Sequence, residues 1–126
     1  DLLTAGLITK LPRMIGVQST ACAPIVEALR QGLDHAAPIV KQSSVAEGIA
    51  LAHPIRDREI LQAIRETDGD AIAVNDEETL AARRELARIG LYVEPTSAVV
   101  GAALKRLRLD GVIVAVLTGS GLKNQL

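Results

Sequence analysis

Apolar residues recur along this chain in two alternating patterns. Short uninterrupted apolar runs, typical of strands buried on both faces, occur at residues 14–18, 71–74, 91–93 and 112–117. Apolar stripes at helical spacing occur within residues 24–31, 60–68, 76–89 and 95–107. Because strands joined through helices are usually parallel, the pattern predicts one α/β domain over residues 1–126, with a mostly parallel open sheet and helices on both faces.

Residues with strong helix-end preferences mark several of these boundaries. Ser19 or Thr20 could cap the first of these helices, and Gly32 is suited to end it. Asn75 and Glu78 have the spacing of a capping box at the start of the helix predicted over 76–89. Pro95 fits the first turn of the last predicted helix.

Two stretches fit this alternation poorly. Residues 1–8 could be the end of a helix, which Pro12 would prevent from continuing. Residues 33–53 show little periodicity and are interrupted by proline, serine and glycine. We interpret the second stretch as a long ordered connection, because it keeps several apolar residues, and connections of this length are often functional.

Composition narrows the class of protein. Of the residues, 48% are hydrophobic but only 1% are aromatic, so the core must consist of Ala, Val, Ile and Leu, which suits helices packed closely on a sheet. The net charge is −1, which gives no basis for binding nucleic acid or an anionic membrane. A single cysteine, Cys22, excludes an internal disulfide, and no membrane helix or signal segment is visible, so we expect a cytoplasmic protein.

Several common catalytic devices are missing from the sequence. It contains no Walker phosphate loop, no GxGxxG after a first strand, no HExxH and no paired CxxC. His35 and His53 lie far apart on irregular stretches, and Cys22 has no obvious partner. We therefore expect no metal site, surface histidines and a small buried thiol.

Three polar motifs remain as candidate chemistry, at 47–48, 94–97 and 118–121. The last two would lie at the same edge of a parallel sheet, where α/β proteins bind ligands. The last two also have a purely structural explanation. Glu94 could be a capping charge, and the glycine-rich segment 118–121 could be a flexible exit from a strand.

Four segments together resemble the C-terminal half of threonine synthases, which are pyridoxal-phosphate enzymes of fold type II. They are Leu-Pro-Arg-Met-Ile-Gly-Val-Gln at 11–18, Val-Ala-Glu-Gly-Ile at 45–49, Val-Glu-Pro-Thr-Ser-Ala at 93–98 and Val-Leu-Thr-Gly-Ser-Gly-Leu-Lys at 116–123. The resemblance runs over essentially the whole chain. The third segment and the small-residue loop also occur in related threonine dehydratases and serine racemases. The residues of the first and last segments favour threonine synthase.

This resemblance implies roles for individual residues. Thr118 corresponds to the hydroxyl residue that bonds the pyridine nitrogen of the cofactor in that family. A neutral hydroxyl leaves this nitrogen largely unprotonated and so moderates the electron sink. The other cofactor-binding residues that the resemblance implies are Glu47 and Gly48 beside the ring, Glu94 near the site, and Gly119 and Ser120 in the matched loop.

The resemblance also implies that essential parts lie elsewhere. The family's Schiff-base lysine and glycine-rich phosphate loop lie upstream of the matched region. None of the four lysines occurs in a matching context; they are Lys10, Lys41, Lys105 and Lys123. We therefore expect no catalytic residue in this chain, which alone should be inactive.

The leading hypothesis is the C-terminal part of a threonine synthase, a lyase that converts O-phosphohomoserine and water to threonine and phosphate. One alternative is a threonine or serine dehydratase of the same fold, and another is a noncatalytic fragment that binds small molecules or partners. The expected partners are an amino-acid substrate, the missing N-terminal half and further copies in a homo-oligomer. A sheet without its neighbouring strands would expose an apolar edge and favour association.

Overall fold

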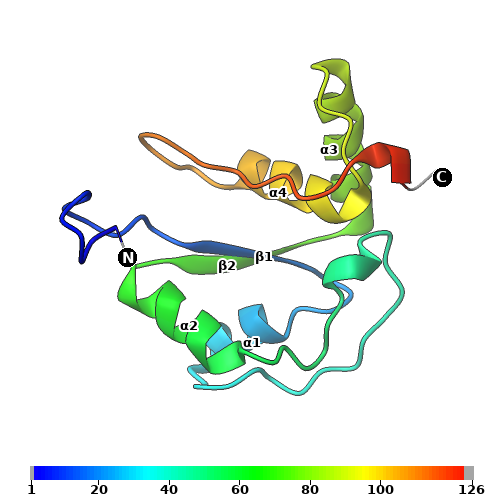
Figure 1. The fold of residues 1–126 in the computed structure, drawn as a ribbon. Coiled ribbons are helices and arrows are strands. Elements are labelled where there is room, and N and C mark those ends of the chain that lie inside the picture. The colour runs from blue at the N-terminus through cyan, green and yellow to red at the C-terminus, as the bar shows by residue number, and fades with distance from the viewer. Residues whose placement is uncertain (1, 124–126) are drawn as a thin grey trace.

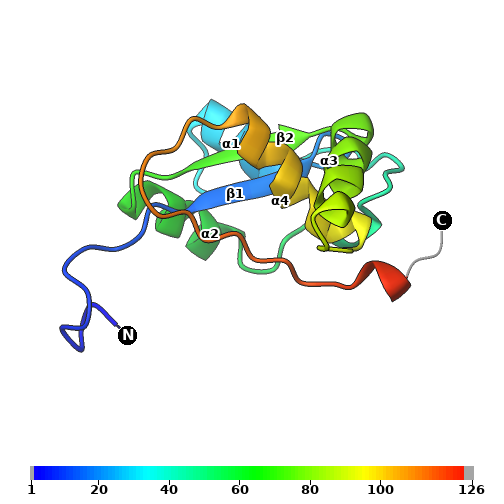
Figure 2. The ribbon, with the colours of Figure 1, turned by 90° about the horizontal axis from the view of Figure 1, so that it is seen from above.

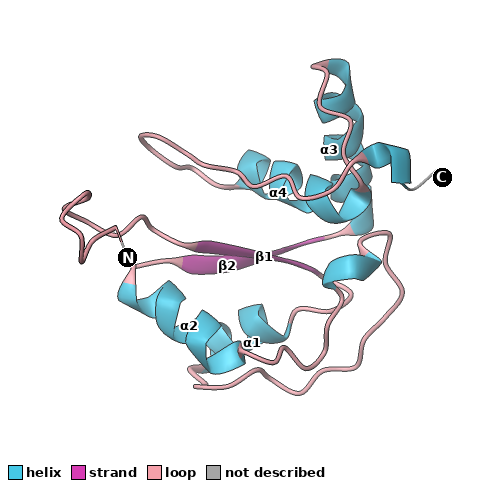
Figure 3. Ribbon diagram, viewed as in Figure 1, coloured by secondary structure: helices cyan, strands magenta, loops and turns pink. Residues whose placement is uncertain are grey.

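A computed structural model describes residues 2–123 of the chain. Its centre is a parallel pair of strands, β1 (Ile15–Ser19) and β2 (Asp70–Val74), with Ile15 opposite Asp70 and Ser19 opposite Val74. Helices cover both faces of this pair (Figure 1). One face carries α1 (Pro24–Gln31) and α2 (Asp57–Glu66), and the other carries α3 (Asp76–Arg88) and α4 (Pro95–Arg106). The predicted α/β class, with parallel strands between helices, is confirmed (Figure 3).

A small apolar core lies on each side of the strands. Between the strands and α1 and α2 it contains Ile25, Leu61 and Ile64. On the other side it consists largely of alanine and valine, from β2, α3, α4 and the segment before η1 (Glu47–Ile49). Small side chains let α3 and α4 approach closely, as a Cβ on Gly101 would lie 3.0 Å from Leu86.

Most of the predicted helix boundaries are confirmed. Gly32 ends α1 with a left-handed φ of 70°. Asn75 and Glu78 form a reciprocal capping box, with N–H to oxygen distances of 2.9 and 2.8 Å. Pro95 opens α4.

The predicted cap of α1 is wrong. Its N-cap is Ala23, which offers no side-chain oxygen, so neither Ser19 nor Thr20 caps the helix. Instead the Gln18 side-chain carbonyl accepts the N–H groups of Ile25 and Val26, at 2.9 and 3.1 Å. A residue on the preceding strand thus caps the helix across space, which sequence spacing does not show.

Two predicted strands do not form among the described residues. Residues 91–93 contribute only an isolated antiparallel bridge, between Val93 and Ser120. Residues 112–117 run back from the end of α4 toward its beginning (Figure 2), with Val112 96% and Val114 85% exposed. A strand needs a neighbouring backbone, and in residues 2–123 the two strands pair only with each other.

The predicted N-terminal helix is also wrong for the residues that the structure describes. Residues 2–7 form turns, closed by hydrogen bonds from Gly6 to Leu3 and from Leu7 to Leu2. Residue 1, where that prediction begins, lies outside the described residues, as do residues 124–126.

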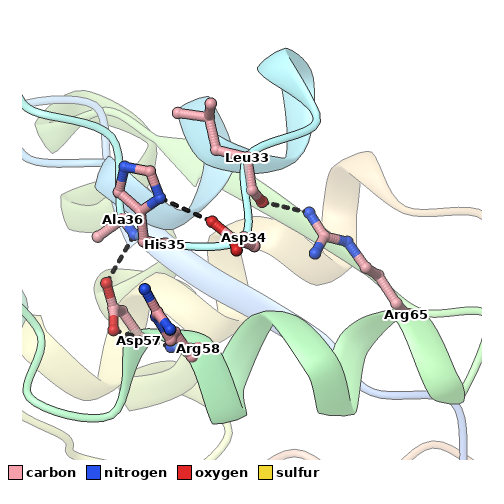
Figure 4. A network of polar contacts seen from close by, with 7 residues as sticks. All are labelled: Leu33, Asp34, His35, Ala36, Asp57, Arg58 and Arg65. Carbon is pink, nitrogen blue, oxygen red and sulfur yellow. Dashed lines mark hydrogen bonds and ion pairs between the residues drawn. The ribbon is translucent and has the colours of Figure 1, made fainter.

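The long connection over 33–53 is held to the helices at two places. Near its start, the Asp57 carboxylate accepts the Ala36 N–H at 2.7 Å, and the Arg65 guanidinium donates to the Leu33 carbonyl (Figure 4). Near η1, the Asp76 carboxylate accepts the Ser44 hydroxyl at 2.6 Å and the Val45 N–H at 3.0 Å. These bonds fix η1 beside the start of α3, at the carboxyl end of the strands.

Candidate functional site

The three polar motifs singled out in the sequence meet at the first turn of α4. Figure 1 shows the start of this helix and η1 at the end of the sheet where β1 and β2 terminate. That end is where open α/β sheets bind their ligands. We call this cluster the α4 site; its members are Glu47, Gly48, Glu94, Thr96, Ser97, Thr118, Gly119 and Ser120.

Ser97 joins the first turn of α4 to the loop that follows residues 112–117. Its side chain is buried, with 2% of the residue exposed. The Ser97 hydroxyl oxygen accepts the Thr118 N–H at 3.0 Å and the Gly119 N–H at 2.8 Å. It also lies 3.0 Å from the Thr118 hydroxyl oxygen. One buried side chain therefore holds both the backbone and the side chain of Thr118.

Glu94 and Gly119 are in close contact. The Glu94 N–H donates to the Gly119 carbonyl at 3.1 Å. A Cβ on Gly119 would lie 2.7 Å from the Glu94 Cγ and closer still to the carboxylate. Any side chain at position 119 would therefore displace the half-buried Glu94 side chain from this place. Glu94 is the N-cap residue of α4, and its side chain makes no capping hydrogen bond to the helix.

Gly48 brings the motif at 47–48 to the same turn of α4. A Cβ on this residue would lie 3.0 Å from the Thr96 hydroxyl oxygen and 3.3 Å from its methyl carbon. Glu47 begins η1 and is exposed, and its carbonyl accepts the Ala50 N–H at 3.0 Å. The absence of a side chain at Gly48 thus lets η1 pack directly on the α4 site.

Ser120 lies at the margin of the α4 site. It forms the isolated bridge with Val93, and its hydroxyl oxygen accepts the Leu122 N–H at 3.3 Å. This bond stabilises the turn into η2 (Gly121–Lys123). The expected proximity of 94–97 and 118–121 is therefore found, but it arises from an antiparallel bridge and Ser97 rather than from two parallel strands.

The sequence interpretation gave Ser97 no role. The residue lay inside the matched Glu-Pro-Thr-Ser segment, and its position in the first turn of a helix was the available signal. Serine is common near helix starts, where its hydroxyl usually bonds its own backbone. Only the fold shows that this hydroxyl serves a loop 21 residues further along the chain.

Other candidate groups lie away from the α4 site or have structural partners. Lys105 forms an ion pair with Glu85, and His35 bonds Asp34 at 2.8 Å in an exposed position (Figure 4). Cys22 is buried, and this burial raises the pKa of its thiol. Within residues 2–123, no cluster of three His, Cys, Asp or Glu side chains is arranged to hold a metal ion. Over the same residues, no helix has the length and apolar character needed to cross a membrane.

Comparison with known proteins gives consistent results. The sequence model of the family described as "Pyridoxal-phosphate dependent enzyme" matches residues 3–119. The threonine synthase of Methanosarcina acetivorans is 40% identical over 126 aligned residues, which cover 94% of this chain and 31% of that protein. The threonine synthase of Mycobacterium tuberculosis is 35% identical, covering 94% of this chain and 33% of that protein. The chain thus spans about a third of the length of these relatives.

Two solved enzyme structures share the fold of this chain. A threonine deaminase from T.th. superposes with a TM-score of 0.60 and 25% identity, covering 83% of this chain and 36% of that one. A serine racemase from Dictyostelium discoideum gives a TM-score of 0.57 at 18% identity, over 80% of this chain and 30% of that one. Since the family model matches nearly the whole sequence, the chain belongs to the family of pyridoxal-phosphate dependent enzymes.

Proposed function

We propose that this chain is the C-terminal part of the cofactor-binding domain of a threonine synthase, which converts O-phosphohomoserine and water to threonine and phosphate. The observation that carries the proposal is the 40% identity to a threonine synthase over 94% of the chain. The proposal includes an amino-acid substrate, a cytoplasmic location and assembly with an N-terminal part. It also includes a homo-oligomeric state.

The donor set of the α4 site fits one edge of pyridoxal phosphate. Thr118 offers an exposed neutral hydroxyl, suited to an unprotonated pyridine nitrogen. Gly48 lets η1 pack against Thr96 at the start of α4, which brings the backbone of η1 to the same edge of the site. When bound, the cofactor supplies an electron sink for carbanion chemistry on the amino-acid substrate.

The remaining residues of the α4 site orient this edge. Glu94 holds a half-buried carboxylate against Gly119, where it can accept a hydrogen bond from a ligand or water. Gly119 and Ser120 keep the loop after Thr118 bridged to residues 92–94. These groups bind and orient, and none is a nucleophile or a general base within the chain.

Two functions must come from another part of the enzyme. Among the described residues, no lysine side chain makes a bond within the α4 site: Lys105 pairs with Glu85, while Lys10, Lys41 and Lys123 are exposed. No glycine-rich phosphate loop occurs in the sequence either. We propose that both are supplied by the portion of the enzyme that corresponds to the other two thirds of the curated relatives.

A cofactor titration tests this division. The full 126-residue chain is titrated with pyridoxal phosphate, reduced with borohydride and analysed by mass spectrometry. The same is done after joining it behind the part of the Methanosarcina threonine synthase that precedes its matched segment. We expect a stoichiometric lysine adduct only in the chimaera, on a lysine outside this chain. A stoichiometric adduct on a lysine of the chain alone would contradict the proposal.

Threonine deaminase is the second candidate, because a threonine deaminase shares the fold at a TM-score of 0.60 and 25% identity. A second chimaera carries the preceding part of that enzyme instead. Since the chain must pack on whichever part it evolved with, we expect only the threonine synthase chimaera to bind the cofactor stoichiometrically and to release phosphate from O-phosphohomoserine. Preferential assembly with the deaminase part, with threonine consumed, would favour the alternative.

A further inference from the structure

Ser97 is a buried polar residue at the centre of the α4 site to which neither the sequence motifs nor the family match assigns a role. We propose that Ser97 is a positioning residue that sets the direction of the Thr118 hydroxyl, so that this hydroxyl donates its hydrogen outward to the ligand. The inference deepens the proposed function and rests on it, because it takes the ligand to be the pyridine nitrogen of pyridoxal phosphate.

Counting hydrogens and lone pairs at Ser97 fixes the direction of the bond. A serine hydroxyl has one hydrogen and two acceptor lone pairs. The Thr118 and Gly119 N–H groups, at 3.0 and 2.8 Å, occupy both lone pairs. The Ser97 hydrogen must then be donated, and the Thr118 hydroxyl oxygen at 3.0 Å is its acceptor.

The opposite direction is unfavourable. If Thr118 donated to Ser97, the Ser97 oxygen would have to accept three hydrogen bonds. Its own hydrogen would then lack a partner at a residue that is only 2% exposed. A buried hydroxyl hydrogen without an acceptor loses its hydration without compensation. Thr118 is therefore an acceptor toward Ser97.

This leaves Thr118 with a free donor on its exposed side. Among the bonds of residues 2–123, none takes the Thr118 hydroxyl hydrogen. A donor suits a pyridine nitrogen only when that nitrogen is unprotonated, because a protonated nitrogen needs an acceptor. Ser97 thereby selects the neutral ring, although it does not touch it.

The rigidity of Ser97 makes this selection effective. It lies in the first turn of α4, where its N–H donates to the Glu94 carbonyl at 3.1 Å. The hydroxyl also holds the backbone of Thr118, so the loop cannot turn this residue away without losing two further bonds. Backbone position and hydroxyl direction are thus set together by one side chain.

The test compares two cofactors in the threonine synthase chimaera that contains the full chain. One is pyridoxal phosphate, and the other is its 1-deaza analogue, in which carbon replaces the ring nitrogen. Dissociation constants are measured for the unaltered protein, for Ser97→Ala and for Ser97→Cys, which nearly preserves the shape. The control is Thr79→Ala, which removes a hydroxyl that is 1% exposed and bonds the Asn75 carbonyl at the start of α3.

We expect Ser97→Ala and Ser97→Cys to weaken pyridoxal phosphate by roughly 3- to 10-fold, the value of one neutral hydrogen bond. The deaza analogue should be weakened clearly less, because it responds only to the loss of the two bonds that hold the loop backbone, and Thr79→Ala should affect neither ligand. Equal weakening of both ligands, or no weakening in the well-folded Cys variant, would overturn the inference alone. Failure of the unaltered chimaera to bind pyridoxal phosphate would overturn the proposed function and the inference with it.

Discussion

Gly69 lies between α2 and β2, at a point where three backbone segments meet. Its N–H donates to the Ile64 carbonyl at 2.7 Å, and the next N–H, of Asp70, donates to the Met14 carbonyl at 3.1 Å. A Cβ on Gly69 would lie 2.8 Å from the Ile64 carbonyl oxygen and closer still to that of Met14. Neither oxygen can rotate away, because both belong to the backbone. Gly69→Ala must therefore move the end of α2 away from the entry to β1.

The size of the effect follows from these contacts. Ordinary contact begins near 3.4 Å, so the methyl group must move by at least 0.6 Å relative to the Ile64 oxygen. Weakening the two hydrogen bonds and straining the packing should lower the free energy of unfolding by about 2 to 4 kcal/mol. Urea unfolding of the chain, followed by circular dichroism, measures this loss directly.

Gly16→Ala is the matched control, because Gly16 lies in β1 on the same side of the sheet as Ile64. A Cβ there would meet Ala71 at 3.4 Å and Ile64 at 3.5 Å, which are ordinary contacts. Its effect should stay within about 1 kcal/mol, since replacing glycine also lowers the entropy of the unfolded chain. If Gly69→Ala were as stable as Gly16→Ala, the argument from backbone crowding would be refuted.

Three further outcomes are expected. Leu61 is fully buried between α1 and the strands, so Leu61→Ala should lower the free energy of unfolding by about 3 to 5 kcal/mol in the same urea assay, and a loss below about 1 kcal/mol would contradict this core. The Ala36 and Arg58 N–H groups hold the pKa of Asp57 below its ordinary value, so this stabilisation is present above that value and is lost as the pH falls through the lowered one. Asp57→Asn should therefore flatten the acid dependence of the unfolding midpoint, and an unchanged acid limb would count against the contact. The exposed apolar residues of 112–117 should make the chain associate at high concentration, and a monomer in sedimentation velocity would argue against this.

Local patterns were sufficient to predict the helices and the two strands that form. The bounds of α3 could be predicted closely because Asn75 and Glu78 mark its start and Gly90 follows its end. The cap of α1 could not, because Gln18 acts from a strand seven residues before the amide that it binds. Contacts of that kind depend on the path of the chain, and a sequence pattern does not contain this path.

The sequence likewise revealed the motifs of the candidate site but not the contact that links them. The motifs around Gly48, Glu94 and Thr118 were found from their similarity to the family's sequences. Because ligands bind at the carboxyl ends of parallel strands, we expected two of these motifs to lie together. Their functional roles stay predictions. Ser97, which links two of these motifs physically, was missed because a serine in the first turn of a helix has a common local explanation.

The error over residues 112–117 shows what an apolar pattern measures. Valine and isoleucine at successive positions indicate that a segment is suited to burial, but they do not show which neighbouring segments bury it. In the described residues this segment has no neighbouring strand, and Val112, Val114 and Val116 are 96%, 85% and 66% exposed. A segment of this composition is costly to leave in water at about 25 cal/mol per Å² of apolar surface. Under the proposed function the missing neighbours belong to the rest of the enzyme. Because this segment leads directly into Thr118, which Ser97 already holds, pairing of the segment with those neighbours and completion of the α4 site would be one event.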